Sequence, residues 1–231
     1  MYYLRPWFIV CCLCLPSYSV VAERNEAVEP SVQGEDVIFL IEEDSLKGWT
    51  VPSDRWSVDR GVVIGDTGPK PIHTPEWLYS ESRFADFIFS AELKLTGSLK
   101  PNSGVYFRVN PILYQRRENA PTFEAAAGYE YDVVAGKFLA SLGDWYARPK
   151  LRILAERAII DRLYNENDWN RMTLRARGNR LEYWLNGVKV LDYMDVDPKG
   201  SREGIIGLQI HDNAVMKIEM RNAHVLPITS D

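Results

Sequence analysis

The sequence predicts an all-β protein built as a two-sheet antiparallel sandwich or jelly roll. Short segments in which polar and apolar residues alternate recur along most of the chain, as expected for strands with one buried face. Turn signals separate these segments, and two of them, Gly178-Asn179 and Asn186-Gly187, are typical of tight hairpins. Strands spaced in this way favour a single sandwich domain.

The expected strands follow one another from the start of the domain to its end. Residues 55–66 read as a hairpin, and residues 86–95 place five apolar side chains on one face. Residues 151–163 form the one helix-like stretch, which could equally be strand and loop, and Pro111 to Gly128 is a candidate loop at the rim of a site. The other expected strands lie within 36–44, 103–110, 129–134, 171–195, 205–210 and 215–228.

Residues 1–22 have the layout of a secretory signal peptide: one early basic residue, a short apolar run and small residues before the cleavage point. The apolar run is shorter than the roughly 20 residues that cross a bilayer. We therefore expect residues 1–22 to be removed, 23–35 to be a flexible polar tail and 36–228 to form one domain. The mature protein would then be periplasmic or secreted, with no integral membrane segment.

All three cysteines, Cys11, Cys12 and Cys14, fall inside this leader. The mature chain would have no thiol for a disulfide or a thiolate metal site. Lipidation of one of them is the alternative, although Val10 and Leu13 stand where a small residue is expected. A domain of roughly 200 residues buries enough apolar surface to fold without disulfides.

The charge balance argues against a nucleic-acid partner. Without the leader, the chain has 26 basic and 32 acidic side chains, a formal charge of −6. Nucleic-acid binding instead depends on clustered Lys and Arg. Seven Trp and twelve Tyr are compatible with a carbohydrate ligand, on which flat rings stack, or with filling a β core.

Candidate site residues are polar side chains opposite the core face of a strand, since the common catalytic motifs for serine hydrolases, zinc proteases and nucleotides are absent. An exposed sheet face would show the same pattern, so alternation alone leaves both interpretations open. His73 in a Pro-rich loop and His224 in the last strand are expected to be structural or solvated. The candidate pairs are Tyr106 with Arg108, Glu130 with Asp132, Glu92 with its neighbours Ser90 and Lys94, and Gln209 with His211.

The chain resembles the family of 3-keto-disaccharide hydrolases from about Val37 to Pro227. The segments that carry the resemblance occur in the family's order, and together they are specific although each is weak alone. They are LKGWTV, RWSVDRGVVIG, ADFIFSAELKL, NSGVYFRV, GYEYDVV, DWN, YWLNGVKVLDY, GIIGLQIHD and MRNAHVLPI.

The resemblance implies a concanavalin-A-like jelly roll, as in lectins and glucanases, and cleavage of glycosides already oxidised to a ketone at C3. The ketone acidifies the hydrogen at C2, so that a base removes it, the glycosidic oxygen leaves and water adds to the enone. His211 is the natural base or acid, because imidazole has an ordinary pKa of about 6.5. Arg108 or Gln209 would hold the enolate or a hydroxyl.

The remaining roles that the resemblance implies are less specific. Glu130, Asp132 and Glu92 could orient the histidine, take the proton or bind a divalent metal through their oxygens. The predicted catalytic residues are His211, Glu130, Asp132 and Arg108, and the predicted substrate-binding residues are Gln209, Glu92, Tyr106, Asn102, Trp145 and Tyr146.

Two positions depart from the resembled family. In the strand EYDVVA, this chain has Asp132 where a Gln is common and Ala135 where an Asp is common. These changes leave open a different substrate or a lectin-like protein that binds sugar without turnover. An ordinary retaining glycosidase is the least favoured alternative, because the expected Glu-x-Asp-x-x-Glu strand is incomplete here.

Overall fold

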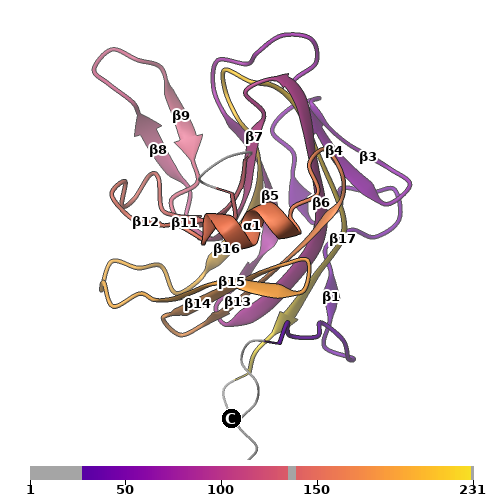
Figure 1. The fold of residues 1–231 in the computed structure, drawn as a ribbon. Helices are drawn as coiled ribbons and strands as arrows, with labels where there is room; N and C mark the ends of the chain where they lie inside the picture. Colours follow the sequence, from indigo (N-terminus) through magenta and orange to yellow (C-terminus); the bar gives the residue numbers. More distant parts are fainter. Residues whose placement is uncertain (1–27, 135–138, 230–231) are drawn as a thin grey trace, which may run out of the picture.

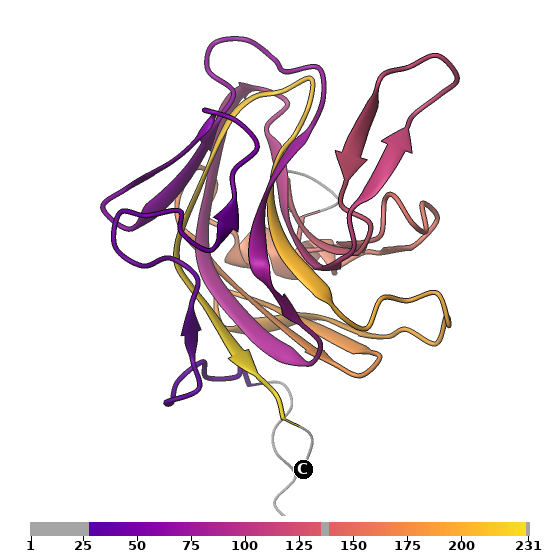
Figure 2. The same cartoon turned by 180° about the vertical axis from the view of Figure 1, so that it is seen from behind.

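The computed structural model describes residues 28–134 and 139–229, so the predicted leader and Ala135 lie outside the described residues. The all-β prediction is confirmed: two large antiparallel sheets pack face to face, with one short helix beside them (Figures 1 and 2). The helix α1, Arg157–Leu163, is the only helix among the described residues, and it is too short to cross a membrane.

The eight-stranded sheet has the order β15-β14-β13-β6-β17-β4-β3, with β1 paired to β17. Its strands are β1 Ile38–Phe39, β3 Trp56–Asp59, β4 Val62–Asp66, β6 Phe87–Leu99, β13 Asn170–Arg177, β14 Arg180–Leu185, β15 Val188–Met194 and β17 Val215–Pro227. The turn signals at 178–179 and 186–187 connect β13 to β14 and β14 to β15, as predicted.

The seven-stranded sheet has the order β12-β11-β10-β7-β16-β5-β2. Its strands are β2 Trp49–Thr50, β5 Glu76–Phe84, β7 Asn102–Val109, β10 Tyr129–Val134, β11 Leu142–Gly143, β12 Arg152–Ile153 and β16 Gly204–Ile210. A separate hairpin of β8 Ile112–Gln115 and β9 Thr122–Ala125 extends beyond both sheets (Figure 1). The candidate loop at 111–128 is therefore a β-hairpin over most of its length.

The core lies between the sheets and follows from the period of two. In β6, the predicted apolar face is buried, with Phe87, Phe89 and Leu93 all at 1% exposure or less. Burial of each such side chain contributes about 1.5–3 kcal/mol. Val105, Phe107 and Leu208 from the other sheet belong to the same cluster, so their alternating neighbours on β7 and β16 point away from the core.

Two tyrosines connect the sheets through this core. The rings of Tyr131 on β10 and Tyr183 on β14 stack with their centroids 4.1 Å apart. The Tyr131 hydroxyl donates to the carbonyl of Trp184 at 2.9 Å, and the Tyr183 hydroxyl donates to the carbonyl of Glu130 at 3.1 Å. Each sheet thus donates a side-chain hydrogen bond to the backbone of the other. Both bonds involve β10, the strand that carries Glu130.

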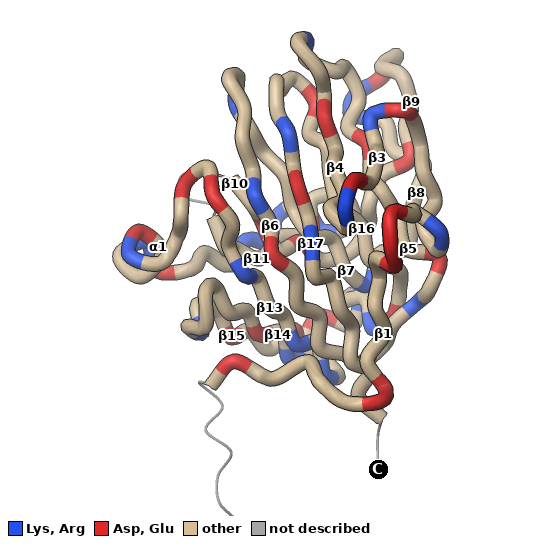
Figure 3. Tube along the Cα trace, turned by 90° about the vertical axis from the view of Figure 1, so that its right-hand side faces the viewer, with Lys and Arg blue, Asp and Glu red and all other residues tan. Residues whose placement is uncertain are grey.

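Acidic and basic residues are interspersed along β6 and β17 of the eight-stranded sheet (Figure 3). They lie on its outer face, because the alternating apolar residues of these strands fill the core. Glu92 pairs with Arg221 at 2.6 Å, and Lys94 pairs with Glu219 at 2.8 Å. The prediction that Glu92 binds substrate is therefore corrected: its strand belongs to the sheet opposite the candidate site, and its carboxylate is engaged in a surface ion pair. Period-two alternation identifies a face of a strand but not the sheet to which it belongs.

The segment predicted as a flexible tail makes specific contacts where it is described. Val28 bridges to Val188, and the Glu29 carboxylate binds the Arg171 guanidinium and accepts a hydrogen bond of 2.6 Å from Thr173. Residues 28–29 are therefore fastened to the eight-stranded sheet. Residues 23–27 lie outside the described residues.

Candidate active site

A cavity of about 820 Å³ opens on the face of the seven-stranded sheet that points away from the core. Its volume lies within the roughly 300–1,000 Å³ of common small-molecule sites. Its walls combine polar residues of the sheet with aromatic and charged residues of the surrounding loops. The lining residues are Lys100, Pro101, Asn102, Tyr106, Tyr114, Arg116, Glu130, Asp132, Val134, Trp145, Tyr146, Gln209, His211, Asp212 and Asn213.

Three adjacent strands form the floor of this cavity. The register of β10 against β7 pairs Glu130 with Tyr106 and Asp132 with Gly104, and β16 borders β7 on its other side with Gln209 on the same face. Glu130, Asp132 and Gln209 are each at most 5% exposed. The predicted site residues Tyr106, Glu130, Asp132 and Gln209 on these three strands are thus brought together.

Gly104 makes room for the carboxyl group of Glu130. A Cβ atom at this position would overlap the Glu130 Oε1 atom. Gly143 on β11 does the same for Trp145, because a Cβ there would lie 2.7 Å from the indole Nε1. Because glycine has no side chain, these two positions let the carboxyl group of Glu130 and the indole of Trp145 approach the sheet closely.

The Glu130 carboxyl group is buried, which raises its pKa to about 8. Hydrogen bonds from Tyr106 and Trp145, together with the positive charge of Arg152, favour the ionised form and oppose this effect without cancelling it. The Arg152 guanidinium lies over the Trp145 ring, 3.1 Å from its centroid. Glu130 is therefore a carboxyl group that exchanges its proton near neutrality.

Asp132 differs from Glu130 in having less support for its charge. Burial, and then the nearby Glu130, raise the pKa of Asp132 well above its usual range, while only Arg152 opposes them. Its Oδ1 atom is buried without a hydrogen-bond partner among the described residues. Two like carboxyl groups that share a buried site do not ionise together readily.

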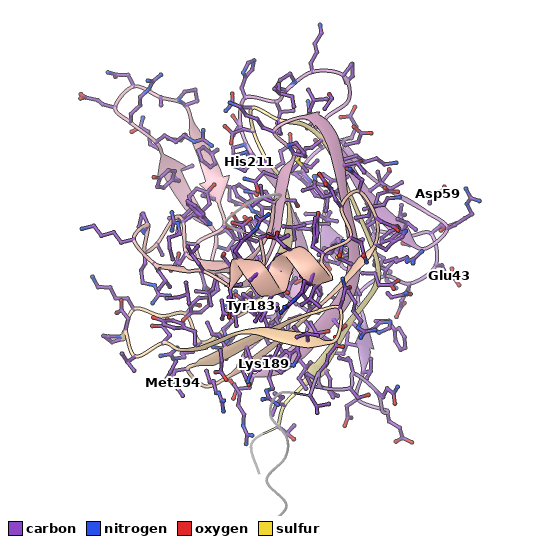
Figure 4. The ribbon with its side chains drawn as sticks, viewed as in Figure 1. Glu43, Asp59, Tyr183, Lys189, Met194 and His211 are labelled. Atoms are coloured by element: carbon purple, nitrogen blue, oxygen red, sulfur yellow. The ribbon has the colours of Figure 1, made fainter. Side chains whose placement is uncertain are left out.

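His211 lies at the mouth of the cavity, immediately after β16 and near the base of the β8–β9 hairpin (Figure 4). Its Nδ1 atom lies 2.7 Å from the Asp212 carbonyl oxygen. A carbonyl oxygen only accepts, so Nδ1 carries hydrogen and Nε2 is the atom that exchanges a proton. The His211 side chain is 37% exposed, which leaves it accessible to a ligand.

A bidentate ion pair connects the hairpin to this mouth. The Arg116 guanidinium donates to both carboxylate oxygens of Asp212, each at 2.7 Å. Asp212 is 2% exposed. Burial acts to raise its pKa, but the hydrogen bonds and charge of Arg116, together with His211 and a backbone hydrogen bond, outweigh burial and lower the pKa of Asp212. Such forked pairs have well-defined geometry, so the hairpin is held over the cavity.

Aromatic residues form the wall on the hairpin side. Tyr114 and Tyr146 meet edge to face with their centroids 5.2 Å apart, and Phe123 packs on both of them. Trp77 on β5 packs beneath, 5.5 Å from Tyr146. Flat rings beside a polar floor suit a sugar, which has both apolar faces and hydroxyl edges.

The turn that carries Trp145 and Tyr146 is fixed by a buried network. Arg148 donates to Asp144 at 2.8 Å and to Asp195 at 2.7 Å, and the Tyr129 hydroxyl donates to Asp195 at 2.5 Å. Asp195 follows β15 of the opposite sheet. This network anchors the turn to both sheets and so helps position the indole beside Glu130.

The prediction that Arg108 holds substrate is corrected by the structure. Its side chain is fully buried at one end of the sheet and does not line the cavity. The guanidinium donates to the carbonyls of Ala85 and Gly178, both at 2.7 Å, and to Asp86 at 2.9 Å. Arg108 has a φ of 50°, next to a register shift between β7 and β16. This bulge directs its side chain away from the face that alternation assigns.

The other two histidines lie away from the cavity. His73 lines a separate shallow hollow beside Lys70 and Thr74. His224 on β17 packs edge to face on Phe39, with centroids 4.7 Å apart, and partial burial lowers its pKa.

Sequence reasoning missed several lining residues, chiefly Tyr114, Arg116 and Asp212. Asp212 directly follows His211 and is the one with a local signal. Tyr114 and Arg116 come from the hairpin, and their approach to the site is a long-range contact.

The asparagines of the motifs DWN and LNG stabilise loops and do not line the cavity. Asn170 donates to the Asn165 carbonyl at 2.8 Å, and Asn186 donates to the Leu163 carbonyl at 2.7 Å.

The described residues contain no group of three or more His, Cys, Asp or Glu side chains arranged to hold a metal ion. The carboxyl pair of Glu130 and Asp132 with His211 therefore does not fit a metal centre by its geometry.

Several solved structures have a similar fold. A protein from Parabacteroides distasonis described as a "putative glycosyl hydrolase" is 18% identical with a TM-score of 0.61, over 84% of this chain and 95% of that one. A carbohydrate-binding module from Bacillus subtilis is 16% identical with a TM-score of 0.51, over 76% and 93%. A legume lectin-like domain from Entamoeba histolytica is 13% identical with a TM-score of 0.51, over 78% and 89%. At these identities the likeness is one of fold, and it confirms the predicted lectin-type jelly roll.

No curated protein sequence matches the chain at a significant level. The sequence model of the 3-keto-disaccharide hydrolases, described as a 3-keto-alpha-glucoside-1,2-lyase-like domain, matches residues 36–226. This match spans nearly all of the predicted domain, including both sheets and the residues that line the cavity. The chain therefore belongs to the 3-keto-alpha-glucoside-1,2-lyase-like family.

Proposed function

We propose that the protein is an exported enzyme that cleaves 3-keto-glycosides, 3-keto-disaccharides among them, by elimination followed by hydration. The observation that carries this proposal is the buried Glu130 carboxyl group, with a pKa of about 8, on the floor of a sugar-sized cavity. A hydrogen next to a ketone is removed by a general base, and such a base works best when its pKa lies near the working pH.

In this proposal, Glu130 on the cavity floor acts as the base and His211 at the mouth acts as the acid. The Glu130 carboxylate removes the C2 hydrogen, and the electron pair of that bond moves toward the C3 oxygen to form an enolate. The enolate collapses, the C1–O bond breaks, and His211 gives a proton from Nε2 to the leaving oxygen. Water then adds at C1 of the enone, and C2 regains a proton, which yields the free 3-keto sugar.

The positions of the two residues support this division. Glu130 is fully enclosed on the floor, where the oxidised ring would sit against Gln209 and Asp132. His211 is half-exposed at the mouth, between the floor and the aromatic wall of Tyr114 and Tyr146. The leaving sugar or alcohol would rest on that wall and depart to solvent.

The test uses purified protein with a 3-keto-disaccharide and its unoxidised parent, with sugar release followed over time. Wild type is expected to cleave only the oxidised compound, and His211→Ala and Glu130→Gln are each expected to lose most of that activity. Release of sugar from the unoxidised parent would instead indicate an ordinary glycosidase. Export is tested by N-terminal sequencing of the protein recovered outside the cytoplasm, which is expected to begin after Ala22.

A lectin-like sugar-binding protein is the second candidate. The observation that favours it is Asp132, which stands where the resembled family commonly has Gln and adds an acid to the floor. Calorimetry decides between the two: saturable binding of the 3-keto-disaccharide by wild type without any release of sugar would favour the binding protein.

A further inference from the structure

The buried side-chain atoms of the cavity lining that lack a hydrogen-bond partner are all acceptors. Asn102 Oδ1, Asp132 Oδ1 and Gln209 Oε1 are buried without partners among the described residues. Gln209 Nε2 donates to the Tyr106 hydroxyl at 3.2 Å. Since Tyr106 in turn hydrogen-bonds Glu130, the amide of Gln209 must face it with its nitrogen. The Tyr106 hydroxyl hydrogen and one of the two Nε2 hydrogens of Gln209 are therefore engaged.

This arrangement is incomplete for the proposed reaction. An enolate oxygen only accepts hydrogen bonds, and elimination through it is slow unless a donor is aimed at the developing charge. Lone pairs from a carboxylate or from two amide carbonyls would repel that charge. The floor can supply the missing donor if one of its two acids keeps its proton.

Asp132 is the acid that keeps it. Glu130 receives hydrogen bonds from Tyr106 and Trp145, which stabilise its charged form, whereas Asp132 Oδ1 receives none from the described residues. The charged groups that act on Asp132 are Glu130 on its own strand, which opposes its ionisation, and Arg152 on β12, which favours it. Lys100 and His211 line the same cavity. When the two acids hold only one proton between them, that proton therefore resides on Asp132.

We propose that Asp132 is a neutral acid that donates its O–H to the C3 oxygen of the substrate and stabilises the enolate. A buried carboxyl group held neutral can act as an oxyanion donor in this way. Asp132 keeps its proton throughout: Glu130 takes the C2 proton, His211 supplies the proton of the leaving group, and the C3 ketone re-forms as C1–O breaks. This role rests on the proposed function.

Three variants separate this role from a structural one. Asp132→Ala removes the donor, and kcat on the 3-keto-disaccharide is expected to fall about 10²–10³-fold, with little change in KM. Asp132→Gln supplies an amide donor, the group common at this position in the resembled family, and is expected to stay within about tenfold of wild type. Asp59→Asn, at an exposed acid at the end of β3 away from the cavity lining, is the control and is expected to keep wild-type kcat and KM.

A direct measurement of protonation accompanies the kinetics. In protein labelled at the aspartate carboxyl carbon, NMR is expected to show one protonated carboxyl group near neutral pH that is absent from Asp132→Gln. Equal rates for wild type and Asp132→Ala, or an ionised Asp132, would refute this inference while leaving the proposed function standing. A wild type that never turns over the oxidised substrate would refute the proposed function itself. If Asp132→Ala does not fold, the NMR result and Asp132→Gln still decide.

Discussion

The buried Glu130 carboxyl group makes the stability of the protein depend on pH, in the sense opposite to that of a salt-bridged acid. Its pKa is about 8 in the folded state, against 4.5 for an ordinary glutamate. Between these values the folded state holds a proton that the unfolded chain releases. A rise in pH therefore favours unfolding, and the stabilisation present below 4.5 is lost as the pH rises through about 8.

The size of this effect follows from linkage. One proton taken up by the folded state alone changes the free energy of unfolding by about 1.4 kcal/mol per pH unit. Between about pH 5.5 and about pH 7.5, Glu130 is expected to lower that free energy by about 2.5 kcal/mol. Asp132, whose pKa is also raised, acts in the same direction.

The assay is urea unfolding followed by tryptophan fluorescence at a series of pH values, for wild type and Glu130→Gln. The difference between the two curves reports Glu130 together with its effect on the neighbouring Asp132, because the other titrating groups are common to both. Glu92→Gln, on the outer face of the opposite sheet, is the matched control and is expected to follow wild type. Parallel curves for wild type and Glu130→Gln would refute the assignment of a neutral, buried acid.

Three further predictions concern residues around the site. Arg108→Met is expected to lower the free energy of unfolding by about 3–5 kcal/mol in urea, because Asp86 and two backbone carbonyls lose their buried partner; wild-type stability would contradict this structural role. Gly104→Ala is expected to reduce kcat/KM about 10²-fold in the cleavage assay, since its Cβ displaces the Glu130 carboxyl group; unchanged kinetics would show that Glu130 is not the base. Arg116→Met is expected to raise KM about tenfold, an effect of about 1.4 kcal/mol, with a smaller change in kcat, because the hairpin loses its bond to Asp212; a fall in kcat alone would argue against a positioning role.

The sandwich and much of the cavity floor were predictable from local pattern. Alternation along a strand follows from backbone geometry alone, so Glu130, Asp132 and Gln209 could be assigned to faces opposite the core without a structure. The same rule assigned Glu92 to a polar face correctly but could not reveal that β6 lies in the other sheet.

The errors arose where the backbone departs from regular strand geometry or where distant segments meet. Arg108 has a positive φ beside a shift in register, and such a bulge has no reliable signal in a single sequence. The ion pair between Arg116 and Asp212 joins residues far apart in the chain. Their proximity depends on where the β8–β9 hairpin folds back, which periodicity does not determine.

The reciprocal bonds between Tyr131 and Tyr183 have a consequence for how the binding region can evolve. Sliding of one sheet over the other would break both hydroxyl–carbonyl bonds together, so shear between the layers is opposed beneath Glu130. The acids on β10 thus rest on a stiff platform, whereas the β8–β9 hairpin and the turn at 144–148 are attached at its edges. Replacing the hairpin or this turn is expected to change which leaving group is accepted without disturbing the proton-transfer geometry. These two segments are therefore the natural ones to redesign.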